Sequence, residues 1–140
     1  MDCQILEMRN ADYDETIQLW RQTPGMGLSS ADERPAIAAF LVRNPGLCFV
    51  ARMGEALVGT ALCGHDGRRG YIYHVAVAEA QRSQGIAKAL VDRCLDGLRQ
   101  QGIEKAHLMV YETNLGGIAF WHKLGWYRRD ELALMSLDLK

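Results

Sequence analysis

The chain has 140 residues, the size of one compact domain, and its 49% hydrophobic and 24% charged residues are ordinary for a globular protein. The formal net charge of −1 and the lack of a basic stripe argue against nucleic acid as a partner. Charged residues interrupt every apolar run before it reaches the ~20 residues of a membrane span. We therefore expect one domain over residues 1–140 that contacts no membrane and is a monomer or a homodimer.

The cysteines indicate a reducing compartment and no metal site. The chain has four of them, widely scattered, with no CxxC pair and no Cys/His cluster. The first four residues also lack the basic and apolar regions of a signal peptide. We expect a cytoplasmic protein with free thiols at Cys3, Cys48, Cys63 and Cys94.

The first half of the chain alternates between strand-like and helix-like patterns. Tyr13, Ile17 and Trp20 fall on one face at helical spacing, and a Pro/Gly-rich segment at 23–28 ends that pattern. Short turns then separate three strand-like runs, which favours an antiparallel meander. The predicted elements are a strand at 3–9, helices at 10–21 and 31–43, and strands at 48–52, 57–63 and 71–77.

The second half predicts a helical crossover followed by a short helix and more strands. A helix at 85–101 separates two strands, which should therefore lie parallel with a right-handed connection. The whole order is β-α-α-β-β-β-α-β-α-β-β, an α/β class with a mixed sheet, about seven strands and four helices. The elements predicted here are a helix at 85–101, a strand at 106–111, a helix at 114–124, and strands at 126–129 and 132–139.

A strand that feeds directly into a helix marks the candidate binding site. The strand at 71–77 is rich in β-branched and aromatic residues, and the turn Arg82–Ala87 opens the next helix. The first N–H groups of a helix have no internal partners and carry partial positive charge, so this turn suits a phosphate. Neither G-x-x-x-x-G-K-[ST] nor three spaced glycines occur there, which excludes two common phosphate loops. An ordinary turn containing Gly85 is the alternative.

The spacing R-x-x-G-x-A at Arg82, Gly85 and Ala87 resembles motif A of the GNAT family of N-acetyltransferases, whose consensus is R/Q-x-x-G-x-G/A. The predicted order of elements matches that family's fold along the whole chain. The resemblance implies the acyl-CoA N-acyltransferase fold, with acetyl-CoA as co-substrate. It also implies direct transfer of acetyl to a primary amine of a small molecule or a peptide, in a ternary complex.

The resemblance also implies which residues bind the cofactor. In the family, the two parallel strands splay apart and backbone groups of the first strand pair with the pantetheine arm. Ser83 stands where the family often has a second Gly, and is tolerated there with a negative φ. Asn114 caps the next helix and reaches the pantetheine arm, with a plain N-cap as the alternative. The implied cofactor-binding residues are Val75, Ala76, Val77, Arg82, Ser83, Gln84, Gly85, Ile86, Ala87, Lys88, Asn114 and Trp121.

The family's usual acid is missing from this chain. It is a Tyr seven residues after the Asn, and Trp121 occupies that position here. An indole N–H is a donor that does not release its proton at a useful pH. Either the thiolate leaves unassisted, since a free thiol has a pKa of only ~8.5, or another tyrosine such as Tyr111 or Tyr127 protonates it. The third explanation is a helix register that is off by one residue, although no neighbouring Tyr would repair it. The alternative function is a non-catalytic acyl-CoA-binding or regulatory module on the same fold.

His74 is the preferred general base, because the family often has Glu or Asp at this place in the strand. A neutral imidazole, with an ordinary pKa of ~6.5, suits proton removal at neutral pH. A buried histidine that is hydrogen-bonded on its strand is the alternative. On the acceptor side, Asp32, Glu33 and Asp66 either attract a cationic amine or are solvated surface charges. Arginines in the turn at 66–70 would instead favour an acidic acceptor, so the acceptor stays open.

Overall fold

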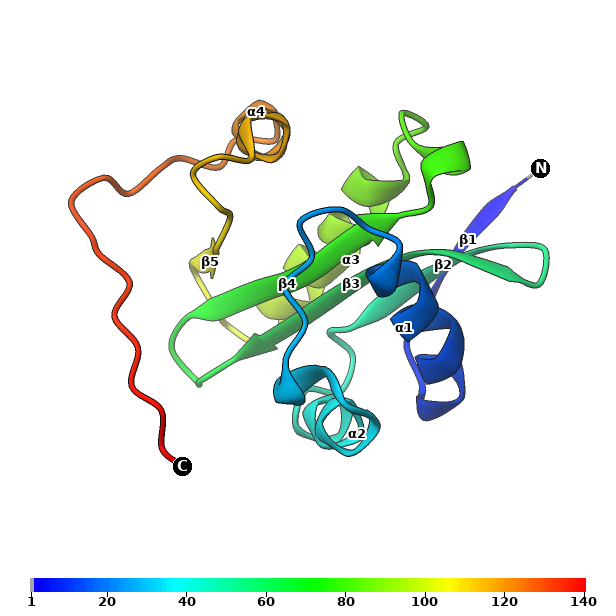
Figure 1. Cartoon of the computed structure of the whole chain (residues 1–140), viewed down its shortest axis with the longest axis horizontal. Coiled ribbons are helices and arrows are strands. Elements are labelled where there is room, and N and C mark those ends of the chain that lie inside the picture. The colour runs from blue at the N-terminus through cyan, green and yellow to red at the C-terminus, as the bar shows by residue number, and fades with distance from the viewer. Residues whose placement is uncertain (1) are drawn as a thin grey trace. The chain divides into compact units, whose positions relative to one another are not determined.

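A five-stranded mixed sheet organises the first part of the chain (Figure 1). The computed structural model describes residues 2–140, which divide into two units with the boundary between Met109 and Val110. The sheet has the order β1-β2-β3-β4-β5, in which only β4 and β5 pair in parallel. The strands are β1 (Cys3–Glu7), β2 (Phe49–Met53), β3 (Ala56–His65), β4 (Gly70–Val77) and β5 (Ala106–Leu108).

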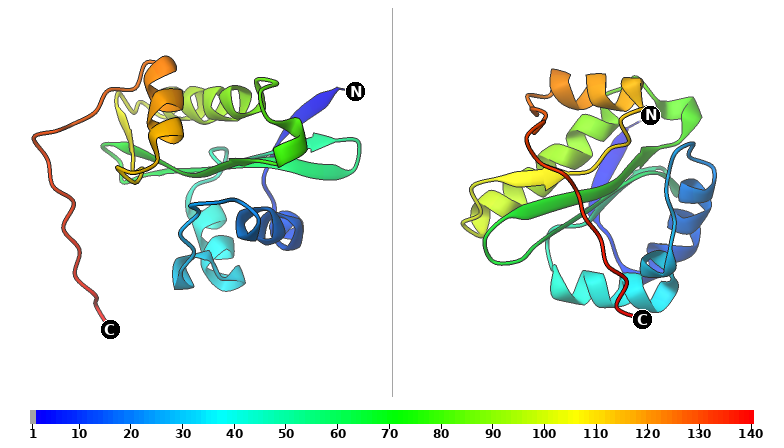
Figure 2. Two further views of the ribbon diagram at one scale, coloured as in Figure 1. Left: turned by 45° about the horizontal axis from the view of Figure 1, so that its top comes forward. Right: turned by 60° about the vertical axis from the view of Figure 1, so that its left-hand side comes forward.

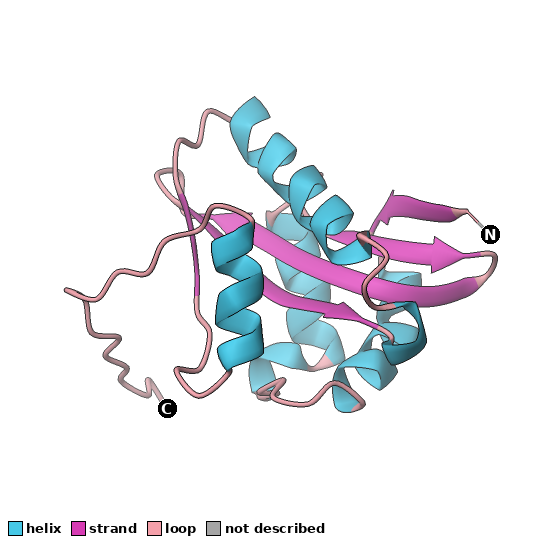
Figure 3. Cartoon of the chain, turned by 90° about the horizontal axis from the view of Figure 1, so that it is seen from above, coloured by secondary structure: helices cyan, strands magenta, loops and turns pink. Residues whose placement is uncertain are grey.

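Helices cover both faces of this sheet (Figure 2). Two of them lie on one face, while the crossover helix between β4 and β5 lies on the other, as Figure 3 also shows from above. No helix within residues 2–140 combines the length and the apolar character needed to cross a bilayer. The first unit contains α1 (Tyr13–Arg21), α2 (Arg34–Arg43) and α3 (Ile86–Gln100), with 3₁₀ turns η1 (Asn10–Asp12), η2 (Ser30–Asp32) and η3 (Glu79–Gln81).

The apolar stripe of α3 packs closely on the sheet because two strand positions have no side chain. A Cβ at Gly70 would lie 2.6 Å from Leu98 Cδ1, and one at Gly59 would lie 3.0 Å from Leu90 Cδ1. Leu90 and Leu98 are both buried. On the opposite face, Trp20 of α1 is the largest side chain of the second apolar layer and is only 1% exposed. The sheet is therefore buried on both faces by helices of predicted amphipathic pattern.

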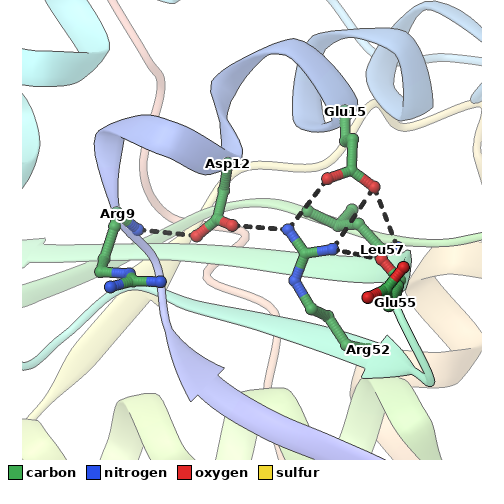
Figure 4. Close-up of polar contacts among 6 residues, drawn as sticks. All are labelled: Arg9, Asp12, Glu15, Arg52, Glu55 and Leu57. Carbon is green, nitrogen blue, oxygen red and sulfur yellow. Dashed lines mark hydrogen bonds and ion pairs between the residues drawn. The ribbon is translucent and has the colours of Figure 1, made fainter.

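A network of charges fastens α1 to the β2–β3 hairpin (Figure 4). Arg52 Nη2 lies 2.6 Å from Asp12 Oδ1 and 3.0 Å from Glu15 Oε1, and Arg52 Nη1 donates to the Glu55 carbonyl at 2.6 Å. Asp12 Oδ2 also accepts the N–H of Arg9, which closes the start of η1. The hydrogen bond from Arg52 lowers the pKa of Glu15. Asp12 is thus a buried carboxylate with a purely structural set of partners.

The second unit contains one helix, α4 (Leu115–Lys123). The predicted strands at 126–129 and 132–139 are wrong, because residues 126–140 form no strand in the described chain. An alternating apolar pattern becomes a strand only where a neighbouring backbone takes its hydrogen bonds, and those residues have no such ladder. The leucines of this segment are consequently exposed by 61% to 94%: Leu132, Leu134, Leu137 and Leu139. The sheet has five strands, where the sequence suggested about seven.

Candidate functional site

The edge of β4 opens beyond its first three residues. The ladder between β4 and β5 ends at the pair Ile72↔Leu108, while β4 itself continues to Val77. The pairing of β4 with β3 shifts register near Thr60, and His74 has a φ of +48° at this bulge. Residues 73–77, which include the predicted Val75, Ala76 and Val77, therefore have no ladder partner on the β5 side within residues 2–140. A strand edge of this kind has backbone groups available for a ligand.

Two left-handed residues shape the loop between β4 and α3. Gly85, the N-cap of α3, has a φ of +82°, and Ser83 has a φ of +66°. The condition under which a Ser would be tolerated here, a negative φ, is not met. The turn requires a left-handed residue there, and a side chain in that conformation costs roughly 1–2 kcal/mol relative to Gly. Arg82 fixes the base of the loop, because its Nε donates to the Val77 carbonyl at 3.0 Å.

This loop presents a row of unpartnered N–H groups. From Ser83 to Lys88, no backbone N–H donates to an acceptor within residues 2–140, and the first helical bond is that from Ala89 N to Gly85 O at 3.0 Å. A Cβ at Gly85 would meet nothing within 4 Å, so the surface above the row is open. Successive free N–H groups at a left-handed turn and a helix start form a cradle for an anion. The Lys88 ammonium pairs with Asp92 at 2.7 Å and lies on the exposed side of α3.

His74 has a carboxylate partner that the sequence did not reveal. Its Nε2 lies 2.7 Å from Oδ1 of Asp32, which is 42 residues away along the chain. Asp32 is only 7% exposed, so the alternative that it is a solvated surface charge is wrong. Its attraction of a cationic amine stays a prediction. The Ser29-x-x-Asp32 spacing could have indicated a capping box, since the Asp32 side chain accepts the N–H of Ser29 at 2.9 Å. Asp66, by contrast, is exposed in its turn.

The cysteines of the core are unsuited to nucleophilic catalysis. Cys48, Cys63 and Cys94 are buried, and all four thiols are free. Burial raises the pKa of Cys48 to about 12. A hydrogen bond with Cys63, together with burial, raises the pKa of Cys94. Because the thiolate is the nucleophile, thiols in this state are inert.

Four of the predicted residues lie in the second unit: Tyr111, Asn114, Trp121 and Tyr127. Asn114 is the N-cap of α4, and its Oδ1 accepts the N–H of Gly117 at 2.9 Å. A Cβ at Gly117 would lie 2.5 Å from Asn114 Nδ2, so the glycine makes room for the capping side chain. The Trp121 ring makes edge contacts with its neighbours in this unit, and Tyr111 is 65% exposed. The roles of these residues in binding and catalysis stay predictions.

Related proteins of known family resemble this chain over almost its full length. The model of the acetyltransferase (GNAT) family matches residues 13–126. Acetyltransferase SG1711 of Sodalis glossinidius is 32% identical over 136 residues, which cover 97% of this chain and 95% of the relative. Acetyltransferase YE1169 of Yersinia enterocolitica is 31% identical over 131 residues, covering 94% of this chain and 92% of the relative.

Solved structures show the same fold. PaiA N-acetyltransferase of Thermoplasma acidophilum, solved in complex with coenzyme A, superposes with a TM-score of 0.80 at 18% identity, covering 93% of this chain and 92% of its own. AAC(6')-Iy, solved with a bisubstrate analogue, gives a TM-score of 0.79 at 15% identity, with 99% of both chains covered. The predicted α/β fold with a mixed sheet is confirmed. The chain belongs to the acetyltransferase (GNAT) family and is an acetyltransferase.

Proposed function

We propose that this acetyltransferase moves the acetyl group of acetyl-CoA directly to a primary amine of a small molecule or a peptide, in a ternary complex. The observation that carries the proposal is the row of free N–H groups from Ser83 to Lys88, which follows the open edge of β4. Coenzyme A has a pyrophosphate next to an arm with two amides, and these groups need an anion cradle beside a free strand edge. The coenzyme A complex of the PaiA relative supports the same assignment.

In this arrangement the pyrophosphate accepts hydrogen bonds from the loop and the start of α3, where Arg82, Gly85 and Ala87 match the family motif. The pantetheine amides pair with the backbone of Val75 and Val77 as a neighbouring strand would. The backbone N–H groups supply the affinity, since hydrogen bonds to a charged group contribute ~1.5–3 kcal/mol each. Asn114 and Trp121, in the second unit, are proposed as cofactor-binding residues on the family resemblance alone.

The acetyl transfer needs a neutral nitrogen and a leaving thiolate. His74 takes one proton from the acceptor's ammonium group, directly or through a water, and passes it to solvent. The nitrogen lone pair then forms the C–N bond, the C–S bond breaks, and its electron pair leaves on the coenzyme A sulfur. The second nitrogen proton ends on that sulfur. Trp121 cannot supply it, so it comes from the nitrogen itself or by way of a tyrosine such as Tyr111.

An acceptor panel tests the proposal. The panel contains a polyamine, an aromatic amine, an amino-acid amide and a peptide with a free N-terminus, and chromatography measures the coenzyme A released from acetyl-CoA. We expect saturable release with at least one amine, and saturable binding of acetyl-CoA by calorimetry. Absence of binding at millimolar acetyl-CoA would refute the assigned site. Binding with no release for any amine would favour the non-catalytic module.

A further inference from the structure

We propose that Asp32 is a positioning residue for His74: it holds the imidazole with the hydrogen on Nε2 and leaves Nδ1 free to take the proton of the acceptor amine. This inference rests on the proposed function, because it names the group that prepares the base. It starts from a contact of 2.7 Å between Asp32 Oδ1 and His74 Nε2.

The partner determines the tautomer of the ring. A carboxylate only accepts hydrogen bonds, so the shared hydrogen belongs to Nε2 of His74. The lone pair of the neutral ring then lies on Nδ1. When Nδ1 takes a proton, the carboxylate of Asp32 stabilises the positive charge that appears on the ring. Asp32 thus acts on the reaction through His74 and needs no contact with the substrate.

Asp32 is fixed before any ligand arrives. Its Oδ2 accepts the Ser29 N–H at 2.9 Å, and its own N–H donates to the Ser29 carbonyl at 3.0 Å. The hydroxyl of Tyr13, on α1, donates to the Asp32 carbonyl at 2.7 Å. The carboxylate therefore has a single orientation, with Oδ1 directed at the ring and Oδ2 occupied by the cap.

His74 is held equally firmly from the other side. The rings of Trp20 and His74 make an edge contact, with their centroids 4.7 Å apart. Trp20 Nε1 donates to Thr60 Oγ1 at 2.9 Å, so the Thr60 hydroxyl gives its own hydrogen to the His74 carbonyl, also at 2.9 Å. A φ of +48° is uncommon for a residue with a side chain. Such a conformation persists where the surroundings impose it, and these bonds do so.

The free nitrogen of the ring reaches solvent. Within residues 2–140, Nδ1 has no hydrogen-bond partner, and Thr16 Oγ1 is the one buried side-chain nitrogen or oxygen without a partner. Nδ1 of the partly buried His74 is therefore accessible to a water or an amine. A nitrogen that is bonded within the protein or fully buried could not exchange a proton with a substrate, whereas this one can. The open Nδ1 is the feature that points to proton transfer.

The chain contains a matched control for Asp32. Asp12 is 6% exposed, against 7% for Asp32, and it closes η1 as Asp32 closes η2. Its Oδ2 accepts the N–H of Arg9 at 2.8 Å, but its Oδ1 meets Arg52 instead of a histidine (Figure 4). Asp32→Asn and Asp12→Asn therefore remove the same charge from equivalent buried caps. Only the first variant alters the partner of His74.

The experiment compares these variants by kinetics and by ¹⁵N NMR of the imidazole rings, with the His74 signals assigned through His74→Gln. We expect the Nε2–H tautomer in the wild type and its loss in Asp32→Asn. In that variant kcat should fall roughly 10²-fold, the scale of one general base, with an unchanged KM for acetyl-CoA. Asp12→Asn should keep both the tautomer and kcat. In the His74→Gln background, Asp32→Asn should lower kcat no further.

An Nδ1–H tautomer in the wild type would overturn the proposal, and so would a normal kcat in Asp32→Asn. If Asp32→Asn does not fold, the wild-type spectrum can still refute the proposal, because it reports which ring nitrogen carries the hydrogen. A failure of the proposed acetyl transfer gives a different result. In that case the wild type releases coenzyme A with no amine of the panel, while the NMR spectrum of the imidazole ring, which does not depend on turnover, is unaffected.

Discussion

The change of Gly85 to Glu should abolish acetyl-CoA binding, and the structure offers a control with the same backbone strain. Gly85 has a φ of +82° and nothing within 4 Å of its Cβ position, and Gly102, at the other end of α3, has a φ of +80° and is equally open. Either substitution places a side chain in the left-handed region, at roughly 1–2 kcal/mol. Both variants carry this backbone cost, and the helix dipole makes a carboxylate ~0.3–1 kcal/mol favourable at Gly85 and unfavourable by a similar amount at Gly102. Only Gly85→Glu adds a negative charge over the free N–H groups.

The expected loss of affinity follows from the charges. Two unit charges ~5 Å apart, at an effective dielectric constant of ~20, repel by ~3 kcal/mol. One such pair raises Kd by more than ~10²-fold, before the lost hydrogen bonds are counted. Titration calorimetry with acetyl-CoA, and urea unfolding of both variants, measure the two effects separately. A Gly85→Glu variant that binds with normal affinity, or a Gly102→Glu variant that loses binding equally, would refute the assigned cradle.

Three further predictions concern the scaffold. Ser83→Gly should raise the free energy of unfolding by up to ~1 kcal/mol, because glycine adopts the positive φ without strain, and it should keep acetyl-CoA binding. Urea unfolding measures the stability and calorimetry measures the binding. A variant less stable than the wild type would contradict the prediction. Gly70→Ala should cost ~1–3 kcal/mol by overpacking against Leu98, seen as a lower urea midpoint; an unchanged midpoint would show that the helix yields. Glu15→Gln should be less stable than the wild type at pH 7, by under ~1 kcal/mol because the side chain is exposed. The hydrogen bond from Arg52 lowers the pKa of Glu15 from 4.5. The difference in stability between the variant and the wild type should therefore vanish as the pH falls below this lowered pKa, where Glu15 is protonated. A difference that persists in acid would contradict the prediction.

The sequence predicted the elements whose pattern is local. The stripe of α3 and the runs of β2, β3 and β4 fall within two residues of their predicted bounds, because periodicity and turn residues determine them. It could not predict the partner of His74, because a contact between residues 42 positions apart depends on how α1, η2 and β4 pack. The positive φ at Ser83 could not be predicted for a related reason, because the path of the loop depends on where the end of β4 and the start of α3 lie in the fold.

The bulge of β4 connects the open strand edge to the position of the base. In a regular strand, successive side chains point to opposite faces. Here Tyr73 packs on Phe40 of α2 and His74 packs on Trp20 of α1, so two consecutive side chains lie on the same face of the sheet. The extra residue turns His74 toward Asp32, and beyond Ile72 the strand has no β5 partner. A chain without the bulge would send the imidazole to the α3 face, away from its carboxylate. The conformation that leaves backbone groups of β4 without a strand partner is thus the one that brings His74, the proposed base, to Asp32.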